Sequence, residues 1–220
     1  MIPLLLWRCP LCAANDALVH TSRRFRPDLV RCTQCGAEWR MRRVPGDNFY
    51  LKLVKGASGL GDERLLADWY AAMKRTVRLA PIRDSAALLH SGEVLYLASG
   101  PAQLQVEEDD PLFFPERGDE LSTAEKREVG GVTVGRGRLF LTNRRLVWLG
   151  EVSSAVVSFP LTRVNSVYAM MDFGVVFLIE MRLYAVCFLE ESLLKWVTYA
   201  ALVAGQVLAE TGHRITTSHF

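Results

Sequence analysis

Four cysteines near the N-terminus constrain the fold of this chain more than any other feature. They form two Cys-x-x-Cys pairs, Cys9/Cys12 and Cys32/Cys35, with nineteen residues between the pairs. Two residues between cysteines allow a tight turn to direct both sulfur atoms at one metal ion, and Zn2+ prefers four such ligands in a tetrahedron. The spacing therefore predicts one structural zinc ion, since four thiolates leave no position open for a catalytic water. A redox-active pair is the main alternative.

The residues around the cysteines resemble the zinc-ribbon family. Three short segments are predicted to form strands: ALVHTSRRF and DLVRC lie between the pairs, and AEWRMRR follows them. A domain of about 40 residues buries too little apolar surface to fold alone, so the metal is expected to form its core. We therefore predict a zinc ribbon over residues 1–45, and the resemblance implies a module that contacts nucleic acid or protein.

Charge is distributed unevenly along the chain. The net charge is only +2, but residues 1–60 carry ten Lys/Arg against four Asp/Glu, whereas residues 81–131 carry four against eleven. The arginines of the ribbon are candidates for a nucleic-acid or partner contact. These arginines are Arg23, Arg24, Arg26, Arg31, Arg40, Arg42 and Arg43. A solvated surface and an intramolecular contact with the acidic segment are the alternatives.

Residues 46–88 are predicted to be a linker that contains one helix. The linker begins with turn-forming residues, and an amphipathic helix is predicted at about 62–79, with Asp62 as its cap and Pro81 after its end. Apolar residues, among them Trp69 and Met73, recur at helical spacing. We expect this helix to dock on the following domain. Insertion at a membrane surface or in the groove of a partner is the alternative.

Residues 89–212 are predicted to form a second domain that is rich in strands. Eight short segments with two-residue alternation are separated by turns, and an acidic loop at about 107–131 interrupts them. An amphipathic helix runs from EESLLKW to Gly212, and residues 213–220 are a tail. The predicted fold class is α+β: a small four-cysteine zinc ribbon, a linker helix, and an antiparallel barrel or sandwich capped by a C-terminal helix.

The second domain resembles the GRAM and bacterial PH-like families. The stretches GRLFLTNRRLVWLG and SFPLTRVNSV carry the resemblance, as does the order of strands followed by a helix. A ribbon ahead of such a domain is also similar to the zinc-finger-bearing GLUE domains. The resemblance implies a module that binds lipid headgroups, peptides or proteins without catalysis.

Lipid-binding members of these families place basic residues in the first hairpin loop, which we predict here to be SGP, without a basic residue. Four other arginines are therefore candidates for contact with an anion or a lipid: Arg136, Arg138, Arg144 and Arg145. The last two are expected to be exposed at the TNRR turn.

The sequence contains no catalytic motif that we can identify. The segment GGVTVGRG opens a strand rather than a helix, so it fails the context test for a phosphate-binding loop, and the four histidines are scattered. We predict a non-enzymatic adaptor without a small-molecule substrate, in which the PH-like domain contacts a partner protein or a membrane surface and the zinc ribbon is a second interaction module. A nucleic-acid-binding protein that uses the basic ribbon is the alternative. No signal peptide and no run of about 18 apolar residues is found, so a cytoplasmic protein is expected, with peripheral association with a membrane as an alternative. A protein partner is expected, with a phospholipid surface and nucleic acid as alternatives.

Overall fold

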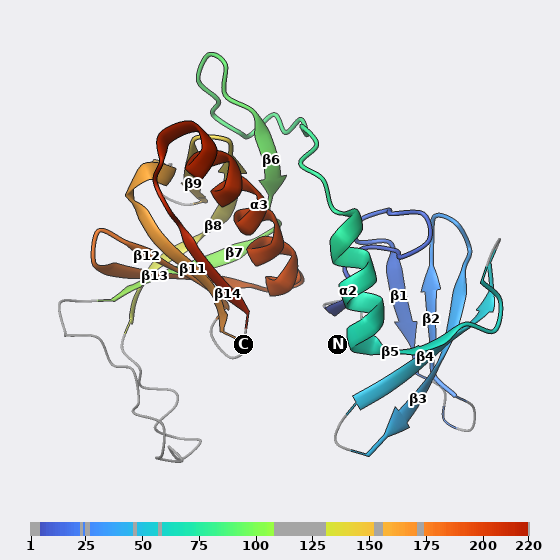
Figure 1. Ribbon diagram of the computed structural model, residues 1–220. Coiled ribbons are helices and arrows are strands. Elements are labelled where there is room, and N and C mark those ends of the chain that lie inside the picture. The colour runs from blue at the N-terminus through green and yellow to red at the C-terminus, as the bar shows by residue number, and fades with distance from the viewer. Residues whose placement is uncertain are drawn as a thin grey trace. The chain divides into compact units, whose positions relative to one another are not determined.

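The chain divides into two compact units, Met1–Leu79 (unit 1) and Ala80–Phe220 (unit 2), in the computed structural model (Figure 1). The structure describes residues 5–22, 24, 27–45, 48–56, 59–107, 131–151, 156–170 and 174–219. Both units combine a mainly antiparallel sheet with helix, which confirms the coarse prediction of an α+β chain.

Unit 1 is an antiparallel sheet of five strands that pair in the order of the sequence. The strands are β1 (Leu18–Thr21), β2 (Leu29–Cys32), β3 (Glu38–Val44), β4 (Asn48–Lys55) and β5 (Glu63–Leu65). The three strands predicted around the cysteines are confirmed as β1, β2 and β3. Strand β4 lies in the stretch that we expected to be a linker. Phe49, Leu51 and Leu53 alternate there with other residues, as a half-buried strand requires.

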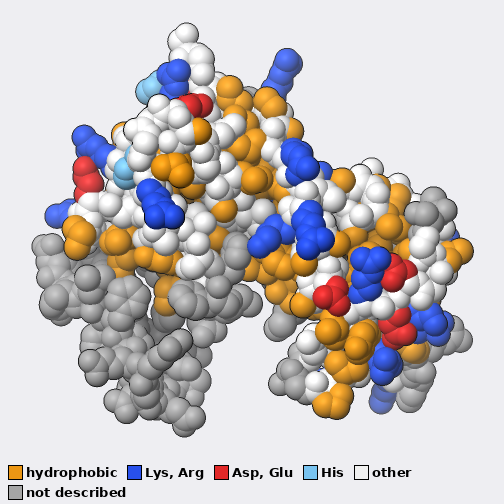
Figure 2. All heavy atoms as spheres, in the orientation of Figure 1, with side chains coloured by type: hydrophobic (Ala, Val, Ile, Leu, Met, Phe, Trp, Pro, Cys, Tyr) orange, Lys and Arg blue, Asp and Glu red, His pale blue; other side chains and the backbone are white. Residues whose placement is uncertain are grey.

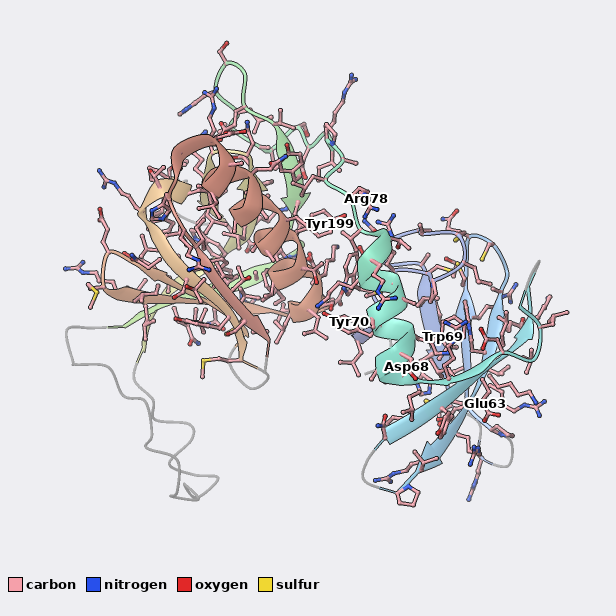
Figure 3. All side chains as sticks on the ribbon, in the orientation of Figure 1. Glu63, Asp68, Trp69, Tyr70, Arg78 and Tyr199 are labelled. Atoms are coloured by element: carbon pink, nitrogen blue, oxygen red, sulfur yellow. The ribbon has the colours of Figure 1, made fainter. Side chains whose placement is uncertain are left out.

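The helix of unit 1, α2 (Leu66–Thr76), packs on strands β4 and β5 of this sheet. The side chain of Trp69, on this helix, points toward the sheet (Figure 3). Its indole Nε1–H donates a hydrogen bond to the carbonyl oxygen of Leu51 at 3.0 Å. The ring of Trp69 also meets Trp39 edge-on, with 6.0 Å between the centroids. The predicted apolar face is therefore buried as expected, but the partner of that face differs from our prediction.

The expected linker, residues 46–88, thus contains two strands and a helix that complete unit 1. The boundary between the units falls at residues 79 and 80. The helix is also shorter than the predicted 62–79, because residues 63–65 pair with β4 as strand β5 and Asp62 lies before that strand. The physical reason is burial: Trp69 and Met73 are buried, and Trp69 contacts Leu51 and Trp39 of the sheet, so unit 1 has an apolar core of its own.

The described part of unit 2 contains nine strands and one long helix. The strands are β6 (Leu95–Ala98), β7 (Ala102–Glu107), β8 (Gly131–Thr142), β9 (Arg145–Gly150), β10 (Val156–Pro160), β11 (Val164–Met170), β12 (Gly174–Ile179), β13 (Arg182–Phe188) and β14 (Thr216–His219). A 3-10 turn, Leu161–Arg163, joins β10 to β11. The eight predicted strands are confirmed as β6–β13. Strand β14 lies in the predicted tail and pairs in parallel with β11.

These strands form one sheet in the order β10-β9-β8-β7-β13-β12-β11-β14, with β6 paired to β8. The strands β10 and β14 at its two ends are not paired with each other in the described part of the chain, so the sheet is not closed into the barrel that we considered. The SGP segment is not a hairpin loop, because β6 and β7 both pair antiparallel with β8. The first hairpin is therefore β7–β8, and its connection, like the predicted acidic loop, lies outside the described residues.

The helix of unit 2, α3 (Leu193–Thr211), covers one side of this sheet. It begins after Ser192, whose side chain accepts a hydrogen bond from the N–H of Lys195, and ends at Gly212 in the left-handed conformation. Strands β6, β11, β12 and β14 all contact α3, so parts of the sheet that are distant in strand order share one helix. Within the described residues, no helix has the length and apolar character that a membrane crossing requires.

Candidate metal centre

The sulfur atoms of Cys9, Cys12, Cys32 and Cys35 lie within 4.8 Å of one another. Cys9 Sγ is 3.8 Å from Cys35 Sγ, and Cys12 Sγ is 3.7 Å from Cys32 Sγ. A metal–sulfur distance of about 2.3 Å in a tetrahedron requires sulfur atoms about 3.8 Å apart, whereas a disulfide requires about 2.05 Å. The four sulfur atoms therefore fit one tetrahedrally coordinated metal ion. Zinc and iron both adopt this coordination with four thiolate ligands.

Each cysteine pair occupies the turn of a small hairpin. The first pair lies between Arg8 and Asn15, which form a β-bridge, and the second begins at Cys32, the last residue of β2. The hydrogen bonds repeat in both turns. Cys9 N–H donates to Ala14 O and Cys32 N–H donates to Ala37 O, while Ala13 and Gly36 N–H donate back to the first cysteine of each pair. The two turns are thus structurally equivalent, although the residues between the cysteines differ, Pro10 and Leu11 in the first and Thr33 and Gln34 in the second.

The residue after each second cysteine has a positive φ, 59° at Ala13 and 70° at Gly36. Glycine adopts this conformation without a steric penalty, whereas a residue with a Cβ atom pays about 1–2 kcal/mol. A Cβ atom at Gly36 would meet nothing within 4 Å, so the cost there comes from the backbone alone. Alanine at position 13 is therefore a strained residue in the first turn.

Separate substitutions at Ala13 and Gly36 test whether the two cysteine turns have the same backbone requirement. We expect Ala13→Gly to raise the stability of metal-loaded unit 1 by up to about 1 kcal/mol, and Gly36→Ala to lower it by about 1 kcal/mol. The measurement is the midpoint of chemical denaturation of the metal-loaded protein, with metal content determined in parallel. Opposite signs are required; a loss of stability in both variants would contradict the argument from φ.

The environment of the thiols differs within each pair. Burial raises the pKa of Cys9 and of Cys35. Burial acts on Cys32 too, but hydrogen bonds from the backbone N–H groups of Cys35 and Gln34 outweigh it and lower the pKa of that thiol. Backbone donors aimed at sulfur favour the thiolate, which is the form that binds a metal.

The chain matches no protein-family model, and no curated protein matches it. The metal centre and the surfaces described next are therefore interpreted from the residues of this chain alone.

Three of the ribbon arginines lie on one exposed face of the unit 1 sheet, which we call the basic face. Arg31 and Arg42 are near carboxylates there, Arg31 at 3.8 Å from Glu38 and Arg42 at 3.3 Å from Glu63. Arg40 lies directly opposite Lys52 on β4, and neither forms an ion pair with another described residue. Basic and acidic side chains alternate on unit 1 in Figure 2.

Of the other ribbon arginines, Arg43 is the one that the described strands place on the opposite side of the sheet. Arg43 points to the opposite side of the sheet from Arg42 because neighbouring strand residues alternate. Arg24 is exposed, and Arg23 and Arg26 lie outside the described residues. The structure therefore brings together three of the seven candidate arginines, with Lys52 as a fourth cation that sequence reasoning missed.

The four candidate arginines of unit 2 divide into two groups. Arg136 and Arg144 are exposed. Arg138 is half-buried, where its guanidinium binds the Asp84 carboxylate at 2.6 Å and lies over the ring of Phe140. This contact lowers the pKa of Asp84. Arg145, which we expected to be exposed, is buried, so two of the four guanidinium groups are held inside the unit.

The partner of Arg145 is Glu93, which sequence reasoning did not identify. Arg145 Nε donates to Glu93 Oε1 at 2.8 Å and Nη2 donates to Oε2 at 2.9 Å, while the side chains of the pair are 11% and 1% exposed. Thr142 also donates to this carboxylate at 2.7 Å. Burial opposes ionisation of Glu93, but these donors lower its pKa to about 2. The LTNRR motif thus fixes the segment before β6 to the β8–β9 hairpin.

Proposed function

We propose that the protein is a non-enzymatic binding protein in which a structural zinc ion stabilises unit 1 and a PH-like unit 2 contacts a membrane surface or a partner protein. Zinc is proposed rather than iron because two Cys-x-x-Cys pairs on the turns of a small sheet are the usual ligand set of a structural zinc site. The zinc would be held by Cys9, Cys12, Cys32 and Cys35, with no position left for substrate.

The proposal rests on the contacts that the candidate polar side chains make within the protein. The four thiols face one another, Arg138 is paired with Asp84, and Arg145 is paired with Glu93. These groups therefore support structure, and the exposed surfaces remain for function. An enzyme would instead be expected to present poised acids, bases or nucleophiles to a substrate.

The strand order supports a PH-like interpretation of unit 2. If β6 and β7 are two parts of one strand along β8, the sheet consists of two antiparallel meanders followed by a helix. This is the order of elements on which the resemblance to GRAM and PH-like domains rests. Exposed Arg136 and Arg144 are the members of the candidate anion site that remain available in such a domain.

Nucleic-acid binding by unit 1 is a second candidate function, and one observation favours it. Arg40 and Lys52 lie opposite each other without an ion pair to a described residue, and the carboxylate opposite Lys52, Glu63, is bound by Arg42. Like charges placed directly across a sheet destabilise it, and a bound phosphate would offset that cost.

One experiment separates these candidates. The full-length, zinc-loaded protein is sedimented with neutral and with phosphatidylserine-containing vesicles, and titrated with a single-stranded oligonucleotide, at low and moderate salt. We expect binding to the anionic vesicles that weakens with salt. Salt-sensitive oligonucleotide binding that is lost in the Arg40→Ser/Lys52→Ser variant, without vesicle binding, would favour the second function instead. Detection of a bound redox metal in place of zinc would contradict the metal assignment.

A further inference from the structure

A compact loop before β6 presents two leucines to solvent. Residues 82–95 form this loop, and its ends are joined by a hydrogen bond from Ile82 N–H to Leu95 O at 2.9 Å. Figure 1 shows the loop projecting beyond the sheet, immediately before β6. Leu88 is 52% exposed and Leu89 is 42% exposed. Loops of this kind, with ends close together and their own packing, are frequently functional.

The backbone of the 82–95 loop is fixed from within the unit. Arg145 Nη2 donates to Leu88 O at 2.6 Å, and His90 N–H donates to the Glu93 carboxylate at 2.8 Å. On the other side of the loop, Ala86 N–H donates to Asp84, and Ala86 and Ala87 pack against a buried cluster of Leu95, Phe140 and Val147. The unit therefore holds the backbone of the loop in one shape, and the two exposed leucines are presented from a fixed framework.

Basic side chains flank the two leucines without local neutralisation. Arg83 belongs to the loop, and a Cβ atom placed on Gly92 would lie 3.6 Å from Nη2 of Arg144. Both arginines are exposed, and neither forms an ion pair with another described residue. The two carboxylates of the loop, Asp84 and Glu93, are each bound by a different arginine. Figure 2 shows basic and hydrophobic side chains close together at this end of unit 2.

We propose that the 82–95 loop inserts Leu88 and Leu89 into the interfacial region of an anionic lipid bilayer, with Arg83 and Arg144 at the lipid phosphates. A bilayer suits this surface better than a protein does. Two leucines on a projecting loop offer far less area than the roughly 1,200 Å2 or more of a stable protein interface. Apolar side chains beside arginines are, in contrast, the composition of surfaces that bind weakly and reversibly to anionic membranes.

The proposal deepens the proposed function by naming the contacting residues, and it rests on that function. Its test compares full-length variants in sedimentation with phosphatidylserine-containing vesicles. Leu88→Asp/Leu89→Asp is expected to weaken binding by roughly tenfold or more, because it removes apolar burial and adds charge repulsion. Leu189→Asp changes another exposed leucine of unit 2, before α3, and is expected to bind as the unchanged protein does.

A second measurement reports insertion directly. All five tryptophans of the chain are buried, so an added tryptophan in the loop stands out against them. In Leu89→Trp, we expect quenching of tryptophan fluorescence by lipids brominated in the acyl chain, and little quenching in the unchanged protein. Circular dichroism and the thermal midpoint of each variant verify that it is folded.

The outcomes distinguish the two proposals. Unchanged binding by the double leucine variant together with no quenching at position 89 would overturn insertion of the loop, while the membrane function of unit 2 would stand. Absence of vesicle binding by the unchanged protein would overturn both the insertion of the loop and the membrane contact. Reduced binding by the double variant, normal binding by Leu189→Asp and quenching at position 89 would support the inference.

Discussion

Removal of the metal is expected to unfold much of unit 1 and to leave unit 2 folded. Binding of a structural zinc ion by four cysteines contributes on the order of 10 kcal/mol to folding, which is comparable to the whole stability of a typical domain. Unit 1 also has an apolar core around Trp39 and Trp69, so its sheet and helix are expected to lose tertiary packing rather than all secondary structure. Calorimetry with and without a chelator measures the two transitions separately.

Cysteine variants make the same test without a chelator. Cys9→Ser removes one buried sulfur of the metal centre, whereas Cys187→Ser changes the half-buried cysteine of β13 in unit 2. We expect about one zinc ion per chain in the unchanged protein and in Cys187→Ser, and a large loss of zinc in Cys9→Ser, together with loss of the unit 1 transition. If Cys9→Ser retains that transition, the metal is not what stabilises unit 1.

The clustering of the four cysteines was predictable because its information is local. Two residues within each pair fix the direction of the sulfur atoms, and the strands before and after the second pair were also correctly predicted. Strand β4 was missed although Phe49, Leu51 and Leu53 alternate, because the glycines around that stretch gave it the composition of a linker. The alternation that indicates a strand was therefore present in the sequence, but the prediction gave more weight to the surrounding glycines.

Contacts between distant segments were not predictable in the same way. The apolar face of α2 indicates that the helix is buried, but nothing in that face distinguishes the sheet before it from the sheet after it. Strands β6 and β7 both pair with β8, and the local sequence of β6 and β7 does not indicate this shared partner. Arg145 lies 52 residues from Glu93, so its burial could not be inferred from the polar TNRR turn in which it sits.

Among the four candidate arginines of unit 2, Arg145 is the one whose loss is expected to lower the stability of the unit most. Arg145→Ala would leave the Glu93 carboxylate, with a side chain that is 1% exposed, without its charge partner. Removing one member of a buried ion pair typically costs about 3–5 kcal/mol. Arg145→Lys retains the charge but cannot donate to Glu93, Ser158 and Leu88 at once, so it is expected to recover only part of the stability. Arg144→Ala, at the exposed neighbour, is expected to change stability by less than about 0.5 kcal/mol.

The pH dependence of these variants identifies the cause of the loss. The folded-state pKa of Glu93, about 2, lies below its ordinary value of 4.5, so the pair stabilises the unchanged protein above about pH 4.5 and this contribution is lost as the pH falls toward 2. In Arg145→Ala, Glu93 is buried without the guanidinium, which raises the pKa of its carboxyl group. Protonation of Glu93 at low pH then removes the unpaired buried charge that destabilises the variant. The difference in unfolding free energy between the two proteins should therefore shrink from about pH 7 to about pH 3, as measured by urea denaturation. A difference that stays constant over this range would mean that Arg145 contributes through packing rather than through its charge.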